Sequence, residues 1–184
     1  MYEGVLVIFS RYWKSYGGVR SLRVSPYLHL SLLLLLLTSH FWYTEKWWEQ
    51  PISVLPNLLG FSLGGLAMFL SFGDERFRSI LAQSDDSSNA SPYMALCSTF
   101  VHFIVLQVAA LLTALVAKSL DFYCEWPSEI SKLVYILTKI FHCGGYLLFL
   151  YSVASILAAT MAVFRTCSWY EAHQQAQQGD SPAP

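Results

Sequence analysis

Ionisable and polar side chains inside long apolar stretches are the residues of this chain whose types and spacing suit chemistry. Lys139, His142 and Tyr146 follow one another at i, i+3 and i+7, so they share one face of a helix. His102 and Gln107 lie inside another apolar run. Such groups are costly within a bilayer and are therefore candidates for ion or proton movement, for example along a path through His102 and His142.

Simpler roles compete with that hypothesis for the same residues. Lys139 lies near the end of its apolar run, so its ammonium group can reach the aqueous interface along its own alkyl chain. His102 can join two helices through a hydrogen bond. We consider both simpler roles the better interpretations, and the proton path stays an alternative.

Several enzyme signatures are absent from the sequence. It contains no HExxH, phosphate-binding loop or dinucleotide-binding glycine pattern, and no carboxylates cluster within the apolar runs. The cysteines show no CxxC spacing: Cys97, Cys124, Cys143 and Cys167. We therefore predict a protein without catalytic residues, metal or cofactor. The formal net charge of −1 and the lack of a Lys/Arg block argue against nucleic-acid binding.

The composition indicates the environment in which these residues must be positioned. Hydrophobic residues make up 55% of the 184 residues and charged residues only 12%, where about 25% is usual in soluble domains. The charges gather in short segments between long apolar runs, as loops alternate with membrane-spanning helices. The sequence therefore predicts an integral membrane protein whose main partner is the lipid bilayer.

Four apolar runs predict an all-α fold, an integral membrane four-helix bundle over residues 27–164. The expected transmembrane helices cover about residues 27–46, 52–72, 93–117 and 133–164. The first contains six consecutive leucines, Leu32 to Leu37, and we expect it on the lipid side of the bundle. A polar loop over 79–92 and a disordered tail over 171–184 complete the prediction.

Basic residues predict the orientation of the bundle. Those expected on one side are Arg11, Lys14, Arg20, Arg23, Arg76, Arg78 and Arg165, against Lys46, Lys118 and Lys132 on the other. The excess places both termini and the 79–92 loop in the cytoplasm. Tryptophans fall at the predicted interfaces rather than at mid-span, which is typical of an aromatic belt: Trp13 and Trp169 on the inner side, Trp42, Trp47, Trp48 and Trp126 on the outer.

The segment before the first apolar run, residues 1–24, reads as an amphipathic arm on the cytoplasmic side. At 100° per residue, one side of a helix over 2–19 carries Val5, Ile8, Phe9, Tyr12, Trp13 and Tyr16. The other side carries Glu3, Ser10, Arg11, Lys14 and Ser15. This pattern predicts an interfacial helix that buries its rings among lipids and leaves its cations near anionic headgroups. An arm packed on the bundle is the alternative.

Small residues recur at helical spacing along two of the predicted spans. The second span carries Gly60, Gly64, Ala67 and Ser71, and the fourth carries Gly145, Ser152, Ser155 and Ala159. Small side chains let helix backbones approach closely in lipid, where association depends on packing. We expect these residues to form helix contacts and to favour a homo-oligomer. A narrow pore or a ligand cleft is the alternative use of the same faces.

The predicted cytoplasmic exit of the second span is charged. Asp74, Glu75 and Arg76 follow Gly73, which is suited to end a helix. A solvated helix end is the simpler interpretation. The functional alternative is a gate or docking site in which Asp74 or Glu75 pairs with Arg165 at the exit of the fourth span.

The segment from Leu55 to Phe77, with the short spans that follow it, resembles small multi-pass inner-membrane proteins of bacteria. In architecture the chain also resembles membrane effectors of bacterial defence systems. The resemblance implies a bacterial inner-membrane location and a self-associating effector that forms a pore or perturbs the bilayer. The alternative function is a membrane anchor or accessory subunit that recruits a soluble cytoplasmic or membrane partner.

Overall fold

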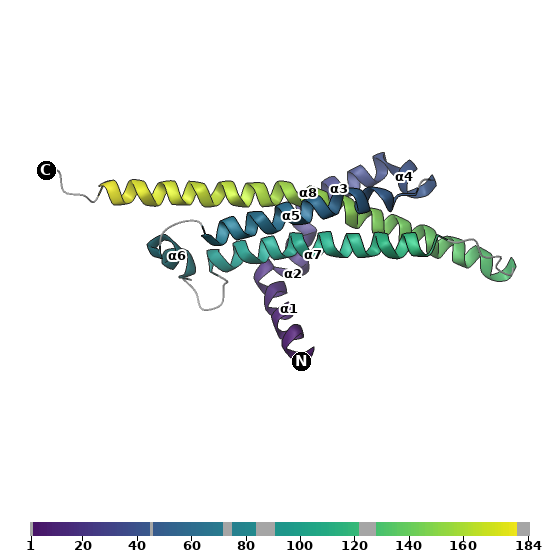
Figure 1. Ribbon diagram of the computed structural model, residues 1–184, viewed down its shortest axis with the longest axis horizontal. Helices are drawn as coiled ribbons and strands as arrows, with labels where there is room; N and C mark the ends of the chain where they lie inside the picture. The colour runs from purple at the N-terminus through teal and green to yellow at the C-terminus, as the bar shows by residue number, and fades with distance from the viewer. Residues whose placement is uncertain (1, 45, 72–74, 84–90, 122–127, 180–184) are drawn as a thin grey trace.

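The computed structural model describes residues 2–44, 46–71, 75–83, 91–121 and 128–179, and its elements over these ranges are all α-helices (Figure 1). In chain order the helices are α1 (Tyr2–Tyr16), α2 (Gly18–Val24), α3 (Pro26–Leu37), α4 (Ser39–Thr44), α5 (Glu49–Ser71), α6 (Glu75–Ala82), α7 (Pro92–Ser119) and α8 (Ser128–Gly179). The predicted all-α fold class is confirmed.

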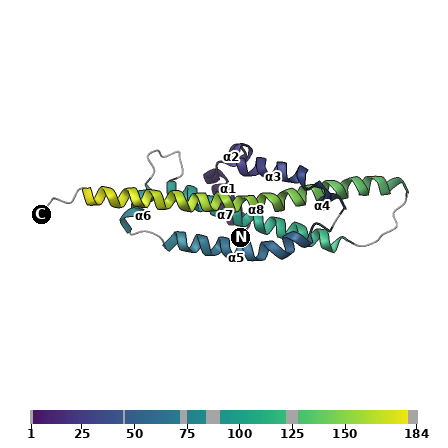
Figure 2. The same cartoon turned by 90° about the horizontal axis from the view of Figure 1, so that it is seen from above.

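Three helices of the described residues are long and apolar enough to cross a membrane: α5, α7 and the Ile130–Ala176 part of α8. At 1.5 Å per residue α5 is about 34 Å long, which exceeds the roughly 30 Å of a hydrocarbon core. The three helices run side by side along the long axis of the molecule in both views (Figures 1 and 2). This arrangement supports the prediction of a membrane protein.

The predicted first span, residues 27–46, is not one continuous helix. It is divided at Thr38 into α3, which has 12 residues and is about 18 Å long, and α4, which has only 6. The Thr38 hydroxyl donates to the Leu34 carbonyl at 2.6 Å, and the Trp42 indole N–H donates to the Leu35 carbonyl at 3.3 Å. The Leu34 carbonyl also accepts the Thr38 backbone N–H at 2.8 Å, and back-bonding of a threonine hydroxyl to such a carbonyl bends a helix, so the chain turns here. Among the described residues, three helices are therefore of membrane length, and the predicted bundle of four membrane-spanning helices is not confirmed.

The leucine-rich helix α3 is not a uniform lipid-facing surface. It lies along α8 (Figure 2) and buries Ser31 completely and Leu35 to 7% exposure. Its outward leucines, such as Leu36 at 73% exposure, keep the expected position. The expected position on the lipid side of the bundle did not distinguish the packed side of this helix, because identical leucines on every side of a helix cannot reveal which side packs.

The N-terminal arm consists of two helices rather than the one predicted over residues 2–19. Gly17 and Gly18 adopt φ values of +98° and +63°, which are left-handed conformations that favour glycine, and they separate α1 from α2. Helix α1 stands across the long axis of the bundle (Figure 1). Its first half is exposed, including Leu6 at 69% and Ile8 at 71%, whereas its last two turns pack on the bundle.

Helix α8 has 52 residues and is about 78 Å long, so it projects beyond α5 and α7 (Figure 1). It continues to Gly179, whereas we predicted disorder from residue 171. Extending an existing helix needs no new nucleus, and Ala, Gln and Glu are good helix formers. Helix α6 packs beside the projecting part, where the Phe77 ring lies 5.1 Å from that of Tyr170.

Candidate functional site

A layer of polar side chains lies between the two apolar clusters of the bundle. One cluster centres on Trp47, Leu55 and Ala110, and the other on Phe69 and Leu96. The buried polar residues of the part between them are Ser62, His102, Gln107, Ser152 and Ser155. Buried polar groups need partners, so the contacts of this layer decide what it can do.

His102 is the centre of a group of rings that joins three helices. Its Nδ1 lies 2.6 Å from the Tyr12 hydroxyl of α1, and its Nε2 lies 3.4 Å from the Tyr151 hydroxyl of α8. The Tyr16 ring stacks on the imidazole with 3.8 Å between centroids, and its hydroxyl lies 3.5 Å from that of Tyr151. We call Tyr12, Tyr16, His102 and Tyr151 the tyrosine–histidine cluster.

The hydrogen bonds of the cluster are suited to holding helices together. Burial raises the pKa of Tyr12 to about 12, and burial with the nearby Tyr151 raises the pKa of Tyr16 above its usual range. Both phenols are therefore uncharged at neutral pH and serve as hydrogen-bonding groups. A neutral imidazole can accept at one nitrogen and donate at the other, which matches two hydroxyl neighbours. The cluster thus fastens α1 to α7 and α8.

Gln107 has a separate structural role in the polar layer. Its side chain is fully buried and its Nε2 donates to the Ser62 hydroxyl at 3.0 Å, which ties α7 to α5. Its Oε1 has no hydrogen-bond partner among the described residues. Gln107 is directed to α5 and His102 to α1 and α8, so these two candidates do not form one site.

The predicted face of Lys139, His142 and Tyr146 lies where α4 ends and α5 begins. Lys139 donates to the backbone carbonyl of Tyr43 and lies 4.3 Å from the centroid of that ring. His142 lies against Trp48 at 5.7 Å between ring centroids.

Tyr146 completes this face by donating to Gln50 Oε1 at 3.3 Å. The three side chains therefore share a region but contact different groups. No hydrogen bond between described residues links His142 directly to His102, and the proton path stays a prediction.

Small residues of α8 pack inside the bundle. A Cβ built at Gly145 would lie 2.7 Å from Trp47 Cζ2, so the glycine makes room for this indole. Trp47 is fully buried here and is not part of an interfacial belt as we expected. Ser152 and Ser155 are also buried, and Ala159 packs against the Phe69 cluster. The face of α8 that we predicted for close helix packing therefore contacts the Trp47 side chain as well as neighbouring helices.

The small residues of α5 face outward. Gly60, Gly64, Ala67 and Ser71 are all exposed, and a Cβ at either glycine would meet no atom within 4 Å. The inward face of α5 instead carries Leu55, Ser62 and Phe69. The two glycines of the predicted packing stripe therefore meet no neighbouring side chain among the described residues.

The charged exit of α5 is only partly described. Asp74 lies outside the described residues, and so do the side chains of Glu75 and Arg76, which leaves their predicted pairing with Arg165 without a test. Arg165 itself is exposed, and its guanidinium lies 5.5 Å from the centroid of the Trp169 ring.

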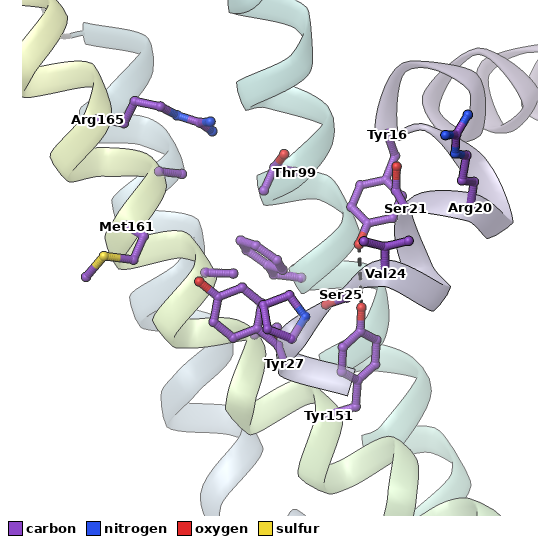
Figure 3. Close-up of a pocket in the computed structure, with 15 residues that line it drawn as sticks. Tyr16, Arg20, Ser21, Val24, Ser25, Tyr27, Thr99, Tyr151, Met161 and Arg165 are labelled. Atoms are coloured by element: carbon purple, nitrogen blue, oxygen red, sulfur yellow. Dashed lines mark hydrogen bonds between the residues drawn. The ribbon is translucent and has the colours of Figure 1, made fainter. Parts of the chain in front are cut away.

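Arg165 also lines a cavity that the sequence did not indicate. A space of about 710 Å³ opens between the arm, α7 and α8, next to the tyrosine–histidine cluster (Figure 3). Arg165 enters it from α8 and Arg20 stands on the opposite side on α2, with the Tyr16 and Tyr151 hydroxyls between the helices (Figure 3). Arg20 and Arg165 are too far apart in the sequence for their spacing to predict a shared site. The only indication in the sequence was that both are basic residues on the predicted inner side.

No family model, curated protein or solved structure matches this chain. Its own residues are thus the basis for a functional proposal. The cavity, the cluster beside it and the projecting end of α8 are the three features that offer one.

Proposed function

We propose that this chain is a membrane-embedded interaction protein, an anchor or accessory subunit that presents the end of α8 to a partner. The projection of α8 carries the proposal. A helix about 78 Å long is more than twice the thickness of a roughly 30 Å hydrocarbon core, so much of it must lie outside the apolar layer. A helix of ordinary length would be sufficient for anchoring alone.

The projecting part of α8 forms a small folded surface together with α6. Phe77 of α6 is only 3% exposed and lies 5.6 Å from His173 between ring centroids, while Thr166 is 2% exposed. The opposite side of α8 remains open, with Cys167 and Glu171 exposed. A helix pair with one packed and one open face supports the recruitment of a soluble protein.

In this proposal the divided first apolar run, which forms α3 and α4, is the fourth membrane-spanning part of the bundle. Helices α3 and α4 follow α8 from the arm to the beginning of α5 (Figure 2). They would carry the chain across the bilayer as a bent segment covered on one side by α8. The basic residues of the arm and Arg165 favour a cytoplasmic position for the arm and the projection. A bacterial inner membrane is the location that the resemblance implies.

Site-specific photo-crosslinking in cells tests this function. A photo-reactive residue at Glu171, on the projection, is expected to capture one recurring partner. The same residue at Leu157, which is 53% exposed within the apolar part of α8, is the control and should capture lipid or nothing. Equal patterns at both positions would contradict a recruiting role for the projection.

Self-association is a second candidate, favoured by the outward face of α5. Gly60 and Gly64 leave an open strip on the lipid side of the chain, and close helix contact in lipid uses such strips. A membrane-perturbing effector would need such an oligomer, because the buried polar groups of the monomer contact one another. Vesicles reconstituted with the full chain distinguish the candidates, since the anchor leaves an entrapped dye in place and the effector releases it.

A further inference from the structure

The cavity beside the tyrosine–histidine cluster is basic at one end. Arg20 and Arg165 line it, and its lining includes no acidic residue. Neither arginine pairs with a carboxylate among the described residues. Two guanidinium groups that line one cavity attract an anion that can accept several hydrogen bonds, and phosphate is the best match to their planar forks. The hydroxyls of Ser21 and Ser25 lie in the same lining as further donors.

The rest of the cavity is mostly apolar, apart from hydroxyl groups such as those of Thr99 and Ser155. Val24, Phe103, Ala158 and Met161 line it between the arginines and Tyr151. On the other side of Tyr151 lies a second cavity of about 420 Å³, whose lining is mostly aliphatic and aromatic. Tyr151 borders both spaces. A ligand for this region must therefore combine an anionic end with an apolar body.

The arginines lie at the level where lipid headgroups are expected. Ala162 packs in the cluster of Phe69 and Leu96, close to the end of α5 and the beginning of α7. Arg165 is one turn beyond Ala162, and Tyr151 is about 21 Å deeper along α8. The basic end of the cavity is thus level with the ends of the three apolar helices. The apolar part of the cavity extends along these helices toward their midpoints.

We propose that this cavity binds an anionic phospholipid, with the phosphate held between Arg20 and Arg165 and an acyl chain along Ala158 and Met161 toward Tyr151. Basic pockets between membrane helices bind phospholipid headgroups in this way. Because Arg20 belongs to the arm and Arg165 to α8, the lipid would bridge the two and add to the hold of the cluster. Charge on the lipid is essential, so a zwitterionic lipid is a poor substitute.

Native mass spectrometry of the full chain in detergent, titrated with phosphatidylglycerol or phosphatidylcholine, tests the headgroup site. Phosphatidylglycerol is expected to bind more tightly. Arg20→Gln and Arg165→Gln should each weaken its binding by about tenfold or more, since each removes a charge-assisted contact. Arg23→Gln is the matched control, because Arg23 is exposed on the same helix α2 but does not line the cavity. An equal loss in Arg23→Gln, or equal binding of both lipids, would overturn the proposal.

Two further measurements separate a lipid from a free phosphate. Ala158→Leu fills the apolar part without changing charge and should weaken phosphatidylglycerol binding, while Thr160→Leu, on the exposed side of α8, should leave it unchanged. Glycerol phosphate, which has the headgroup chemistry but no acyl chain, should not compete at millimolar concentration. Unchanged binding in Ala158→Leu, or effective competition by glycerol phosphate, would identify a simple anion site instead. Thermal melting of each variant checks that it is folded.

Discussion

The Tyr12 hydroxyl lies 2.6 Å from His102 Nδ1, a hydrogen bond between residues 90 positions apart. His102 is about 15 Å along α7 from Pro92, so the bond fixes the end of α1 below the rim of the bundle. An interfacial helix typically lies about 5–10 Å into the boundary between headgroups and acyl chains. The last turns of α1 are therefore packed on the bundle, as the alternative interpretation of the arm has it, and contact of its exposed first half with lipid stays a prediction.

Loss of this bond should loosen the arm. We expect Tyr12→Phe to weaken arm docking by about 1 kcal/mol, because it removes one hydrogen bond and keeps the ring. Tyr16→Phe is the matched comparison and should have a smaller effect, since the Tyr16 hydroxyl lies at 3.5 Å from its partner and its ring does the stacking. Hydrogen exchange of the α1 amides is the measurement. Equal protection in the parent and in Tyr12→Phe would show that the bond does not hold the arm.

Between neutral and moderately alkaline pH, docking of the arm should be insensitive to the ionisation of Tyr12. The pKa of Tyr12 rises from 10.0 to about 12 because the docked phenol is buried, so docking favours the protonated form. The contribution of Tyr12 is complete below a pH of about 10 and is lost as the pH rises through about 12. The anisotropy of a fluorophore on a cysteine replacing Val5 should stay constant up to the first value and fall toward the second. A fall near neutral pH would assign the transition to another group.

Gly145 and Gly144 should respond to the same substitution with opposite signs. A methyl group at Gly145 overlaps the fully buried Trp47 indole, so Gly145→Ala should destabilise the fold by about 1–3 kcal/mol. A Cβ at Gly144 meets nothing within 4 Å, so Gly144→Ala should stabilise α8 by up to about 1 kcal/mol. Thermal unfolding in detergent measures both. Similar melting temperatures for the two variants would mean that Trp47 does not occupy this position.

Gly64 and Gly65 separate association from folding. Gly64 faces outward, so Gly64→Leu should leave the melting temperature unchanged and weaken self-association by roughly tenfold. A Cβ at Gly65 already lies 3.6 Å from Phe100 Cε1, so Gly65→Leu should lower the stability of the bundle. Cross-linking in detergent and in vesicles reports the oligomer. If Gly64→Leu assembles as the parent does, the outward face of α5 is not an interface.

Two native cysteines test the proposed orientation. A membrane-impermeant maleimide applied to intact cells should label a variant that retains only Cys124 and should not label one that retains only Cys167. Cys167 is exposed on the projection of α8, which we place in the cytoplasm. Once the cells are permeabilised, the maleimide should label both variants. Labelling of Cys167 alone in intact cells would invert the orientation.

The sequence by itself determined the fold class and the membrane-length helices. Long apolar runs interrupted by short charged segments specify helices in lipid, because each backbone group must be satisfied within its own segment. Helices α5, α7 and α8 accordingly contain the predicted spans. The amphipathic pattern likewise predicted a helix over the arm, since period and composition are local properties.

Tertiary structure alone decided how these helices meet. Whether Leu35 packs or faces lipid, whether Gly64 or Gly145 receives a neighbour, and whether Arg20 and Arg165 line the same cavity all depend on the rotation and contact of helices. In lipid, apolar residues pay no penalty for facing outward, so hydropathy carries no information about which face is inside. Hydroxyl back-bonding at Thr38 and the glycine break at Gly17 then fixed where the first helices end, and with them the place at which Tyr12 reaches His102.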